Sequence, residues 1–182
     1  DEGDGLIGAF LTKGVSDLIV CTESGMAIRF KESDVRAMGR TARGVRAITL
    51  GEDDRVVNLA AVEDEETASK DDAQSLLTVC KNGYGKRTAV SEYRCQGRGG
   101  KGVIDIKTTE RNGVVIGSSV VQEGDDVMII TTAGKVIRIQ VGGISRIGRN
   151  TQGVHLVNLE PEESVAAIAR IVEEENGEEA AE

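Results

Sequence analysis

The chain of 182 residues contains no tryptophan, one proline, one histidine and only 2% aromatic residues. Proteins that bind single-stranded nucleic acids stack the bases on aromatic rings, so this composition argues against that class. The lone histidine, His155, has no counterpart in the repeats described below, and no convergent group of catalytic side chains is visible. We therefore expect His155 to be a strand residue and this chain by itself not to be an enzyme.

Long apolar runs are also lacking, since none approaches the ~20 residues of a membrane-spanning helix. The N-terminal sequence DEGDG does not resemble a signal peptide. We expect no membrane partner and a cytoplasmic location. The cysteines Cys21, Cys80 and Cys95 are odd in number and irregularly spaced, as is typical of reduced thiols. With one histidine to join them, we expect no metal site and no cofactor in this chain.

The formal net charge of −9 is unevenly distributed. Residues 63–72 carry six acids and one lysine, and residues 172–182 carry six acids and no base, so the rest of the chain has a formal charge of +2. We expect residues 172–182 to form a solvated, disordered tail. The alternative is a tail that competes with nucleic acid for a basic surface.

A seven-residue box occurs three times, as GRTARGV at 39–45, GRGGKGV at 97–103 and GRNTQGV at 148–154. The same offsets of 58 and 51 residues align three hairpin-like stretches, each with a central glycine and an arginine four residues after it. Repetition at such a period is typical of propellers and other repeat proteins. The predicted repeats cover residues 6–55, 56–113 and 114–171.

Each repeat has the pattern of four short strands. An apolar run such as DLIVCT is followed by a glycine turn and an alternating stretch such as AIRFK, as in a β-hairpin. A third strand follows each box, and a fourth begins at Leu6, Val56, Val114 or Val165. Four strands in ~50 residues is typical of a propeller blade. We predict an all-β fold of propeller-like, four-stranded blades, with about three blades that form a partial wheel.

The central box, QGRGGKGV at 96–103, fits the dinucleotide-binding pattern G-x-G-x-x-G. That motif requires a helix after the loop, whereas VIDIK is typical of a strand, and the other two boxes lack the middle glycine. A P-loop is excluded because Cys95 and Gly102 stand where it needs a glycine and a hydroxyl residue. We expect the glycines to shape turns and the interspersed cations to contact phosphates.

The boxes therefore predict sequence-independent binding of double-stranded DNA, because cations repeated at blade spacing can follow a phosphate backbone. The predicted contacts are the cations of the boxes and hairpins together with one amide: Arg29, Arg36, Arg40, Arg43, Arg46, Lys86, Arg87, Arg94, Gln96, Arg98, Lys101, Arg138, Arg146 and Arg149. The glycines assigned to the central box are Gly97, Gly99, Gly100 and Gly102.

QGRGGKG resembles the glycine-rich box of the C-terminal domain of DNA gyrase A subunits, and MGRTARGVRAITLGEDDRVV, NGYGKRTAVSEY and GRNTQGVHLVNL are similar to later repeats of that domain. The resemblance covers nearly the whole chain. It implies a β-pinwheel, whose neighbouring blades exchange strands, with DNA wrapped around its basic edge. It also implies a place in a bacterial type IIA topoisomerase of two A and two B subunits, which introduces negative supercoils. The catalytic domains, ATP and Mg²⁺ of that enzyme would lie outside this chain.

Two alternatives remain open. The C-terminal domain of the topoisomerase IV A subunit resembles this chain but usually has a degraded box, so the intact QGRGGKG favours gyrase. A protein-interaction propeller without a DNA role would instead bind its partners through the acidic segments 63–72 and 172–182. In either case we expect Tyr84 and Tyr93 to be structural residues.

Overall fold

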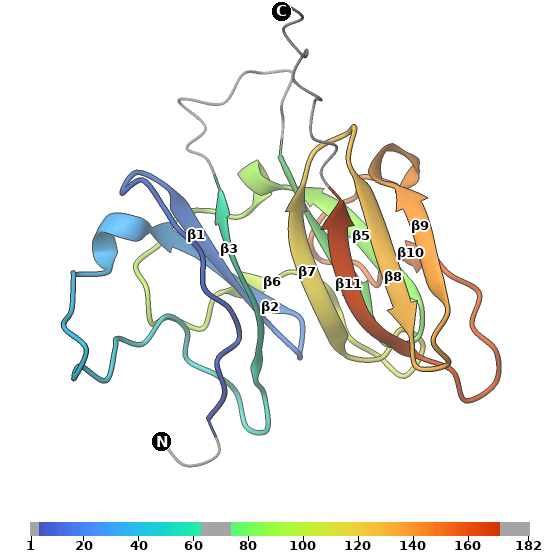
Figure 1. The fold of residues 1–182 in the computed structure, drawn as a ribbon, viewed down its shortest axis with the longest axis horizontal. Helices are drawn as coiled ribbons and strands as arrows, with labels where there is room; N and C mark the ends of the chain where they lie inside the picture. The colour runs from blue at the N-terminus through green and yellow to red at the C-terminus, as the bar shows by residue number, and fades with distance from the viewer. Residues whose placement is uncertain (1–3, 63–73, 172–182) are drawn as a thin grey trace, which may run out of the picture.

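A computed structural model describes residues 4–62 and 74–171 (Figure 1). Our expectations for the acidic segments 63–72 and 172–182 lie outside these residues. Within the described ranges the chain forms strands, loops and short 3-10 turns, so the predicted all-β class is confirmed. No helix in this part of the chain is long and apolar enough to cross a membrane.

The strands follow one another in three similar groups. The first comprises β1 (Asp17–Thr22), β2 (Met26–Lys31), the 3-10 turn η1 (Glu32–Asp34) and β3 (Val56–Val62). The second comprises β4 (Ser75–Cys80), β5 (Tyr84–Ala89), η3 (Val90–Glu92), β6 (Val103–Ile104) and β7 (Val115–Val121). The third comprises β8 (Asp126–Thr131), β9 (Val136–Gln140), η4 (Val141–Gly143), β10 (Val154–His155) and β11 (Val165–Ile171).

The strands form three antiparallel sheets, which we name blades A, B and C. Blade A has the order β3-β1-β2-β6, blade B has β10-β5-β4-β7, and blade C has β11-β8-β9. The edge strand of blade A therefore comes from the second group, and that of blade B from the third. This exchange of strands between neighbours confirms the predicted pinwheel architecture. In the described residues, blade C has three strands rather than the four that we predicted.

Each hairpin turns at the glycine that the repeat alignment identified. Gly25, Gly83 and Gly134 have φ angles of 85°, 79° and 80°, which side chains other than glycine rarely adopt. The strands on either side pair in the same register in all three blades, so that Cys21 faces Ala27 and Val79 faces Gly85. The repeated sequence pattern thus produces a repeated backbone geometry.

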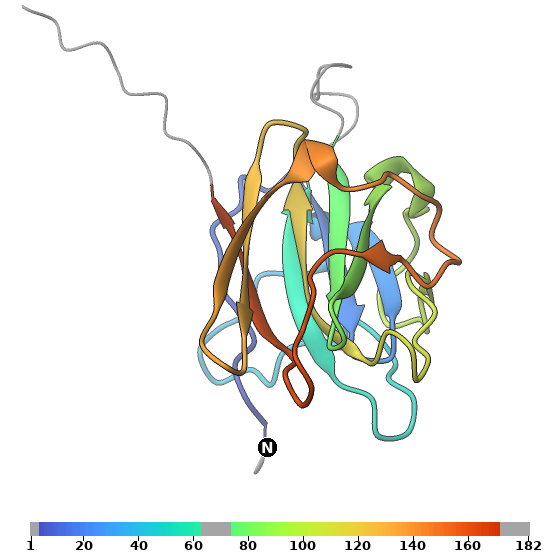
Figure 2. The same cartoon turned by 90° about the vertical axis from the view of Figure 1, so that its right-hand side faces the viewer.

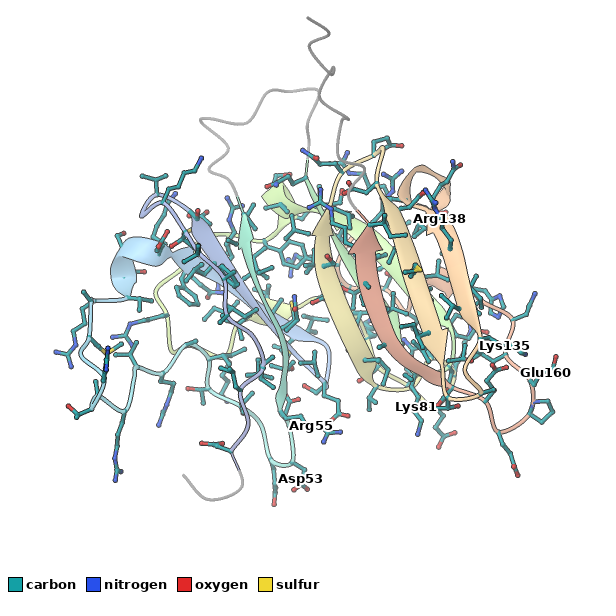
Figure 3. The ribbon with its side chains drawn as sticks, viewed as in Figure 1. Asp53, Arg55, Lys81, Lys135, Arg138 and Glu160 are labelled. Atoms are coloured by element: carbon teal, nitrogen blue, oxygen red, sulfur yellow. The ribbon has the colours of Figure 1, made fainter. Side chains whose placement is uncertain are left out.

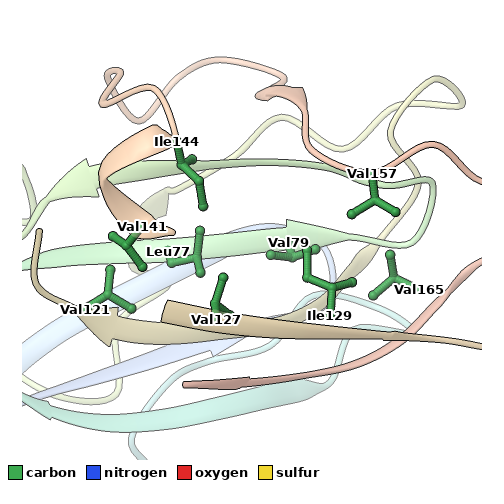
Figure 4. Close-up of a cluster of buried hydrophobic side chains, with 9 residues drawn as sticks. All are labelled: Leu77, Val79, Val121, Val127, Ile129, Val141, Ile144, Val157 and Val165. Atoms are coloured by element: carbon green, nitrogen blue, oxygen red, sulfur yellow. The ribbon is translucent and has the colours of Figure 1, made fainter. Parts of the chain in front are cut away.

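The apolar core lies between the blades. One buried cluster joins blades B and C and includes Leu77 of β4, Val121 of β7 and Ile129 of β8 (Figure 4). A second cluster joins blades A and B through residues such as Ile19 of β1 and Leu76 of β4. The hairpin strands contribute to both sides of the sheets, as their continuous apolar runs predicted. Each blade is therefore stabilised mainly by burial against its neighbour.

Two predicted strands do not form. Residues 4–12 have no strand, and Leu6 and Leu11 are exposed. The counterparts β3, β7 and β11 pair with the hairpin that precedes them in the sequence, and no such hairpin precedes Leu6 among the described residues. Likewise residues 45–50 form no strand, although β6 and β10 occupy the same position in later repeats. Both segments lack a hairpin to pair with in this structure, which explains the difference.

Gly102 lies at the contact between blades A and B, and a substitution there tests how closely the two backbones pack. Its φ angle is 76°, and a Cβ atom there would lie 2.4 Å from the carbonyl oxygen of Ala27. We predict that Gly102→Ala lowers the free energy of unfolding by about 2 kcal/mol or more, because it adds backbone strain and a clash with main-chain atoms. Urea denaturation measures the change. Gly97→Ala is the matched control, since nothing lies within 4 Å of a Cβ at Gly97, and an equal loss in both variants would contradict this account.

Candidate nucleic-acid interface

The second and third boxes each lie beside the segment that follows the preceding box. The N–H of Gly99 in the central box donates to the carbonyl of Ala47, 2.6 Å away, and the N–H of Thr49 donates to the carbonyl of Gly100 at 2.8 Å. On the other side, the N–H of Lys107 donates to the carbonyl of Thr151 at 2.8 Å. Main-chain hydrogen bonds therefore connect the central box to the residues that follow the first box, and the third box to the residues that follow the central box. We call the combined segments 36–46, 94–102 and 145–153 the box strip.

The box strip is basic throughout its length. Segment 36–46 has four cations, 94–102 has three and 145–153 has two, and none of the three segments contains an acid. Eight of these nine side chains belong to exposed residues and Arg149 is half-buried. Glu92 borders the strip near Gly148. Within the described part of the chain no acid forms an ion pair with Lys101, and its ammonium group is available to a ligand.

The arginine at the second residue of the box also forms hydrogen bonds within the protein. An Nη of Arg98 donates to the carbonyl of Arg46 at 3.1 Å, and Nε donates to the carbonyl of Asp34 at 3.0 Å. Arg149 makes the equivalent bond to the carbonyl of Ile104, at 2.9 Å. Each of these arginines thus holds the box region of the preceding repeat in place. Arg98 has further N–H donors, but part of its guanidinium is already in use.

The central box owes its shape to two glycines with positive φ angles. Gly99 has a φ of 82° where it contacts the first box region, and Gly102 approaches the backbone of β2. Gly97 and Gly100 have more open surroundings. The predicted contact Gln96 is half-buried, and its main-chain N–H donates to the carbonyl of Arg29 at 2.9 Å. Its position in the box is therefore set by blade A.

Three predicted DNA contacts need correction, because they lie in the interior. Lys86 is 0% exposed, and the exposed fractions of Arg29 and Arg87 are 6% and 7%. The alternation of AIRFK suggested that Arg29 and Arg87 face outward, but the 3-10 turns of the next repeat cover that face of β2 and β5. Lys86 lies on the opposite face, at the position that the buried Ile28 has in the first repeat. These three cations cannot reach a phosphate in this fold. Arg138 differs, since its side chain is 56% exposed and forms an ion pair with Asp126.

The buried arginines join neighbouring repeats. The guanidinium of Arg29 donates to the carboxylate of Asp17 at 2.7 Å and to the carbonyl of Val90 at 3.1 Å, in the 3-10 turn of the next repeat. Arg87 donates to the carbonyl of Ile144 at 2.6 Å, at the end of the following 3-10 turn. A hairpin arginine therefore fixes the turn from which the next box segment starts.

Lys86 is fully enclosed by the next two box regions. Its Nζ donates to the carbonyls of Asp105 at 2.6 Å, Arg149 at 2.8 Å and Gly148 at 3.1 Å, and to Oγ1 of Thr88 at 2.9 Å. Burial lowers the pKa of this lysine, while the Asp105 carboxylate, 3.5 Å away, favours its charged form. Lys86 therefore connects the third box to the segment that follows the second box.

Asp105 is the residue that sequence reasoning missed. Its carboxylate accepts hydrogen bonds from the Tyr93 hydroxyl at 2.5 Å and from Oγ1 of Thr78 at 2.7 Å, in addition to its ion pair with Lys86. Burial and the adjacent carboxylate raise the pKa of Tyr93. The available signal was an acid within the apolar alternation VIDI. Tyr93 and Tyr84 have structural contacts, the latter with His155, which lies in strand β10.

Asp105→Ala tests this buried network. The substitution leaves the Lys86 ammonium without its counter-charge and removes the acceptor of Tyr93 and Thr78. We predict a loss of about 3–5 kcal/mol in the free energy of unfolding, as is usual when one partner of a buried ion pair is removed. Chemical denaturation provides the measurement. Glu110→Ala, which removes an exposed acid nearby in the sequence, should change stability little, and a similarly small effect of Asp105→Ala would refute the role of the network.

The described residues contain no group of three or more His, Cys, Asp or Glu side chains that could hold a metal ion. The arrangement instead combines a rigid, strand-exchanged scaffold with a strip of exposed cations. Fold and strip together define a propeller-like repeat domain with a basic edge.

Comparison with known proteins gives the family. The sequence profile described as "DNA gyrase C-terminal domain, beta-propeller" matches residues 16–63, 74–122 and 125–171, which correspond to the three groups of consecutive strands. The chain belongs to this family. It is 47% identical over 179 residues to the DNA gyrase A protein of Klebsiella oxytoca, 46% identical over 172 residues to that of Escherichia coli K12, and 43% identical over 173 residues to that of Staphylococcus aureus.

These matches cover 98%, 94% and 95% of the chain, which itself spans about a fifth of the length of each relative (20%, 19% and 19%). Two solved structures have similar folds. The C-terminal domain of DNA topoisomerase IV has a TM-score of 0.79 and 26% identity, over 89% of this chain and 48% of that one. The DNA gyrase A C-terminal domain has a TM-score of 0.76 and 27% identity, over 87% and 51%.

Proposed function

We propose that this chain is a non-catalytic module that binds and bends duplex DNA. The observation that carries the proposal is the box strip, whose three segments present nine cations and no acid and are positioned by hydrogen bonds to the neighbouring repeats. Contacts to phosphates supply affinity without reading the sequence of bases. The strip crosses from one blade to the next, so a duplex that follows it is bent rather than held straight.

Within the strip, the exposed cations other than Arg98 and Arg149 are the proposed phosphate contacts. Arg98 and Arg149 use part of their guanidinium groups to hold the preceding repeat, and so act mainly as positioning residues. Arg43 and Lys101 are exposed and represent the first and second boxes. We therefore choose these two residues for tests of phosphate binding.

The proposed phosphate contacts are exposed, whereas the cations of the first two hairpins are buried. Arg29, Arg87 and Lys86 lie in the interior, where main-chain carbonyls accept hydrogen bonds from each of them. Arg43 and Lys101 face solvent instead. A substitution at either exposed residue therefore changes the charge of the box strip without disturbing the contacts that join the blades.

In the complete enzyme we propose that this module supports negative supercoiling. Because the relatives are gyrase A subunits, the module would act beside the catalytic domains of gyrase A and gyrase B, in an assembly of two A and two B subunits. ATP and Mg²⁺ would be used by those other domains. The DNA held against the box strip would be presented to them as a positively crossed segment. The expected location is the cytoplasm, where the DNA lies.

The salt dependence of duplex binding tests the proposal. The logarithm of the binding constant should fall linearly with the logarithm of the salt concentration, with a slope of about −0.9 per phosphate contact. We predict that Arg43→Ala and Lys101→Ala each weaken binding for all duplex sequences and reduce the magnitude of this slope by about 1. Fluorescence anisotropy with a labelled duplex provides the measurement.

Lys81→Ala is the matched control for these variants, because Lys81 is an exposed lysine on the β4–β5 hairpin, outside the box strip (Figure 3). It should leave both affinity and slope almost unchanged. Salt-independent binding, or an equal effect of all three substitutions, would reject the box strip as the DNA contact. Bending is assessed separately, by ligating nicked plasmid in the presence of the protein and comparing the topoisomers.

Cys95 offers a second measurement at the strip. Burial raises the pKa of the Cys21 and Cys80 thiols to about 12, whereas Cys95 is exposed between Arg94 and Gln96. We predict that a thiol reagent modifies Cys95 alone in the folded protein, since the other two thiols are protonated and inaccessible at neutral pH. Saturating duplex should slow this reaction, as followed by mass spectrometry. Equal rates with and without DNA would place the duplex elsewhere.

A further inference from the structure

A buried polar cluster distinguishes the second repeat from the other two. Five interior positions of this repeat, each at most 1% exposed, hold polar side chains: Thr78, Lys86, Thr88, Tyr93 and Asp105. The aligned residues are apolar in the first repeat (Val20, Ile28, Phe30, Val35 and Ala47) and in the third (Ile129, Ile137, Ile139, Ile144 and Leu156). Because all five positions differ together, the polar residues act as a group.

The hydrogen bonds of this polar cluster lead to the third box. Oγ1 of Thr88 donates to the carbonyl of Ile147 at 2.8 Å. Nζ of Lys86 donates to the carbonyls of Gly148 and Arg149, at 3.1 and 2.8 Å. The two donor atoms are themselves 2.9 Å apart. Three consecutive carbonyls at the start of the third box therefore point into the interior, toward one place.

The second box is positioned differently. The residues that correspond to Lys86 and Thr88 in the first repeat are Ile28 and Phe30, whose side chains have no hydrogen-bond donors. The main chain takes part instead, since the N–H of Gly99 donates to the carbonyl of Ala47 at 2.6 Å. An N–H of the second box is therefore used to attach that box to the first repeat.

Lys86 replaces this main-chain bond between the second and third repeats. The counterparts of Gly99 and Ala47 there are Asn150 and Asp105. The carbonyl of Asp105 accepts a hydrogen bond from Nζ of Lys86, at 2.6 Å, rather than from the box. The N–H of Asn150 is consequently not needed to hold the third box in place.

The inward carbonyls determine where the N–H groups of the third box point. No cis peptide bond occurs among the described residues, and the C=O and N–H of a trans peptide point in opposite directions. The N–H groups of Gly148, Arg149 and Asn150 therefore point away from the interior. Within residues 4–62 and 74–171, nothing accepts a hydrogen bond from these three groups. Figure 2 shows this segment, in orange, at the periphery of the molecule.

The position stays accessible when a further repeat follows. Gly97 and Arg98 are the counterparts of Gly148 and Arg149 in the second box, which the third repeat follows in the chain. Both are exposed, as Gly148 is. A following repeat thus does not cover the beginning of a box, and the N–H groups of the third box do not owe their exposure to the end of the chain.

We propose that the N–H groups of Gly148, Arg149 and Asn150 bind one phosphate group of duplex DNA, and that Lys86 and Thr88 are the positioning residues of this site. A row of main-chain N–H groups next to exposed cations suits a phosphate at close range. The inference rests on the proposed function and adds a main-chain contact to the side-chain contacts of the box strip. It gives the interior lysine a role in DNA binding, through the orientation of the peptide groups that it holds.

Amide hydrogen exchange, followed by NMR, tests the site in the unmodified protein. The three N–H groups should exchange rapidly in the free protein, because they have no acceptor. Saturating duplex should slow their exchange at least about tenfold. The exposed Gly124, in the turn between β7 and β8 and outside the box strip, should keep its rate.

The double variant Lys86→Met/Asp105→Asn tests the positioning role. It removes the donor of the two box carbonyls together with the opposite charge, so that no unpaired charge is buried. We predict that duplex affinity falls about tenfold and that the magnitude of the salt slope falls by about 1, as for the loss of one phosphate contact. Duplex should then no longer slow exchange in the third box. Val127→Ala is the matched control, because it opens a cavity in the core between blades B and C without touching the box.

Glu92→Gln provides a variant that should gain affinity, which a loss of folding cannot imitate. A carboxylate oxygen of Glu92 would lie 3.6 Å from a Cβ at Gly148, so this acid stands at one end of the proposed site. Its neutralisation should tighten duplex binding about two- to threefold. Glu110→Gln removes an exposed acid away from the box strip and should have almost no effect. Equal gains in both variants would contradict the site.

The outcomes separate this site from the proposed function. Salt-dependent duplex binding with unchanged exchange at residues 148–150 would overturn the site and leave the proposed function intact. So would a double variant that is folded by circular dichroism and keeps both affinity and slope. Duplex binding that does not depend on salt would reject the proposed function, and the site with it.

Discussion

The pairing of a two-residue strand with the hairpin of the preceding repeat is the contact on which the rest of the structure depends. It is short, but it comes with two hydrogen bonds to a glycine carbonyl and an arginine that holds the adjacent 3-10 turn. The box immediately precedes this strand. The same contact that joins two blades therefore fixes the position of the loop that carries the exposed cations.

Arginine has two roles here, and its surroundings determine which one applies. Arg29 and Arg87 lie inside, where fixed carbonyls and acids satisfy several of their N–H groups. In the boxes, Arg98 and Arg149 bond to carbonyls of the preceding repeat on one side and lie near the surface. The planar guanidinium allows both uses because it offers several donors in fixed directions. Lysine also occurs in both surroundings, since Lys101 is exposed and Lys86 is fully enclosed.

The structural features that could be predicted from the sequence are those that local residue patterns determine and that recur in each repeat. Glycine turns, apolar hairpin strands and the three boxes are visible as patterns, so blades and box strip could be inferred. The partners of Lys86 could not be inferred, because its ammonium group donates to backbone carbonyls at residues 148 and 149, more than 60 residues away. The pattern of AIRFK indicated one covered face, whereas strand exchange covers both. The strand predicted at Leu6 does not form, because a strand needs a neighbouring strand to pair with and the sequence pattern does not show whether one is present.

Shared use of the box segments would couple the proposed DNA binding to the association of blades. Thr49 and Gly99 hold the first and second boxes together, and Arg98 spans the same boundary. A duplex that contacts both boxes in this arrangement binds the assembled blades more tightly than separated ones, and by linkage it stabilises the junction between them. The reverse also holds, because a well-formed junction presents the cations of neighbouring boxes already in place and reduces the entropy lost on binding. The contacts that join the blades and the cations of the box strip therefore depend on the same segments.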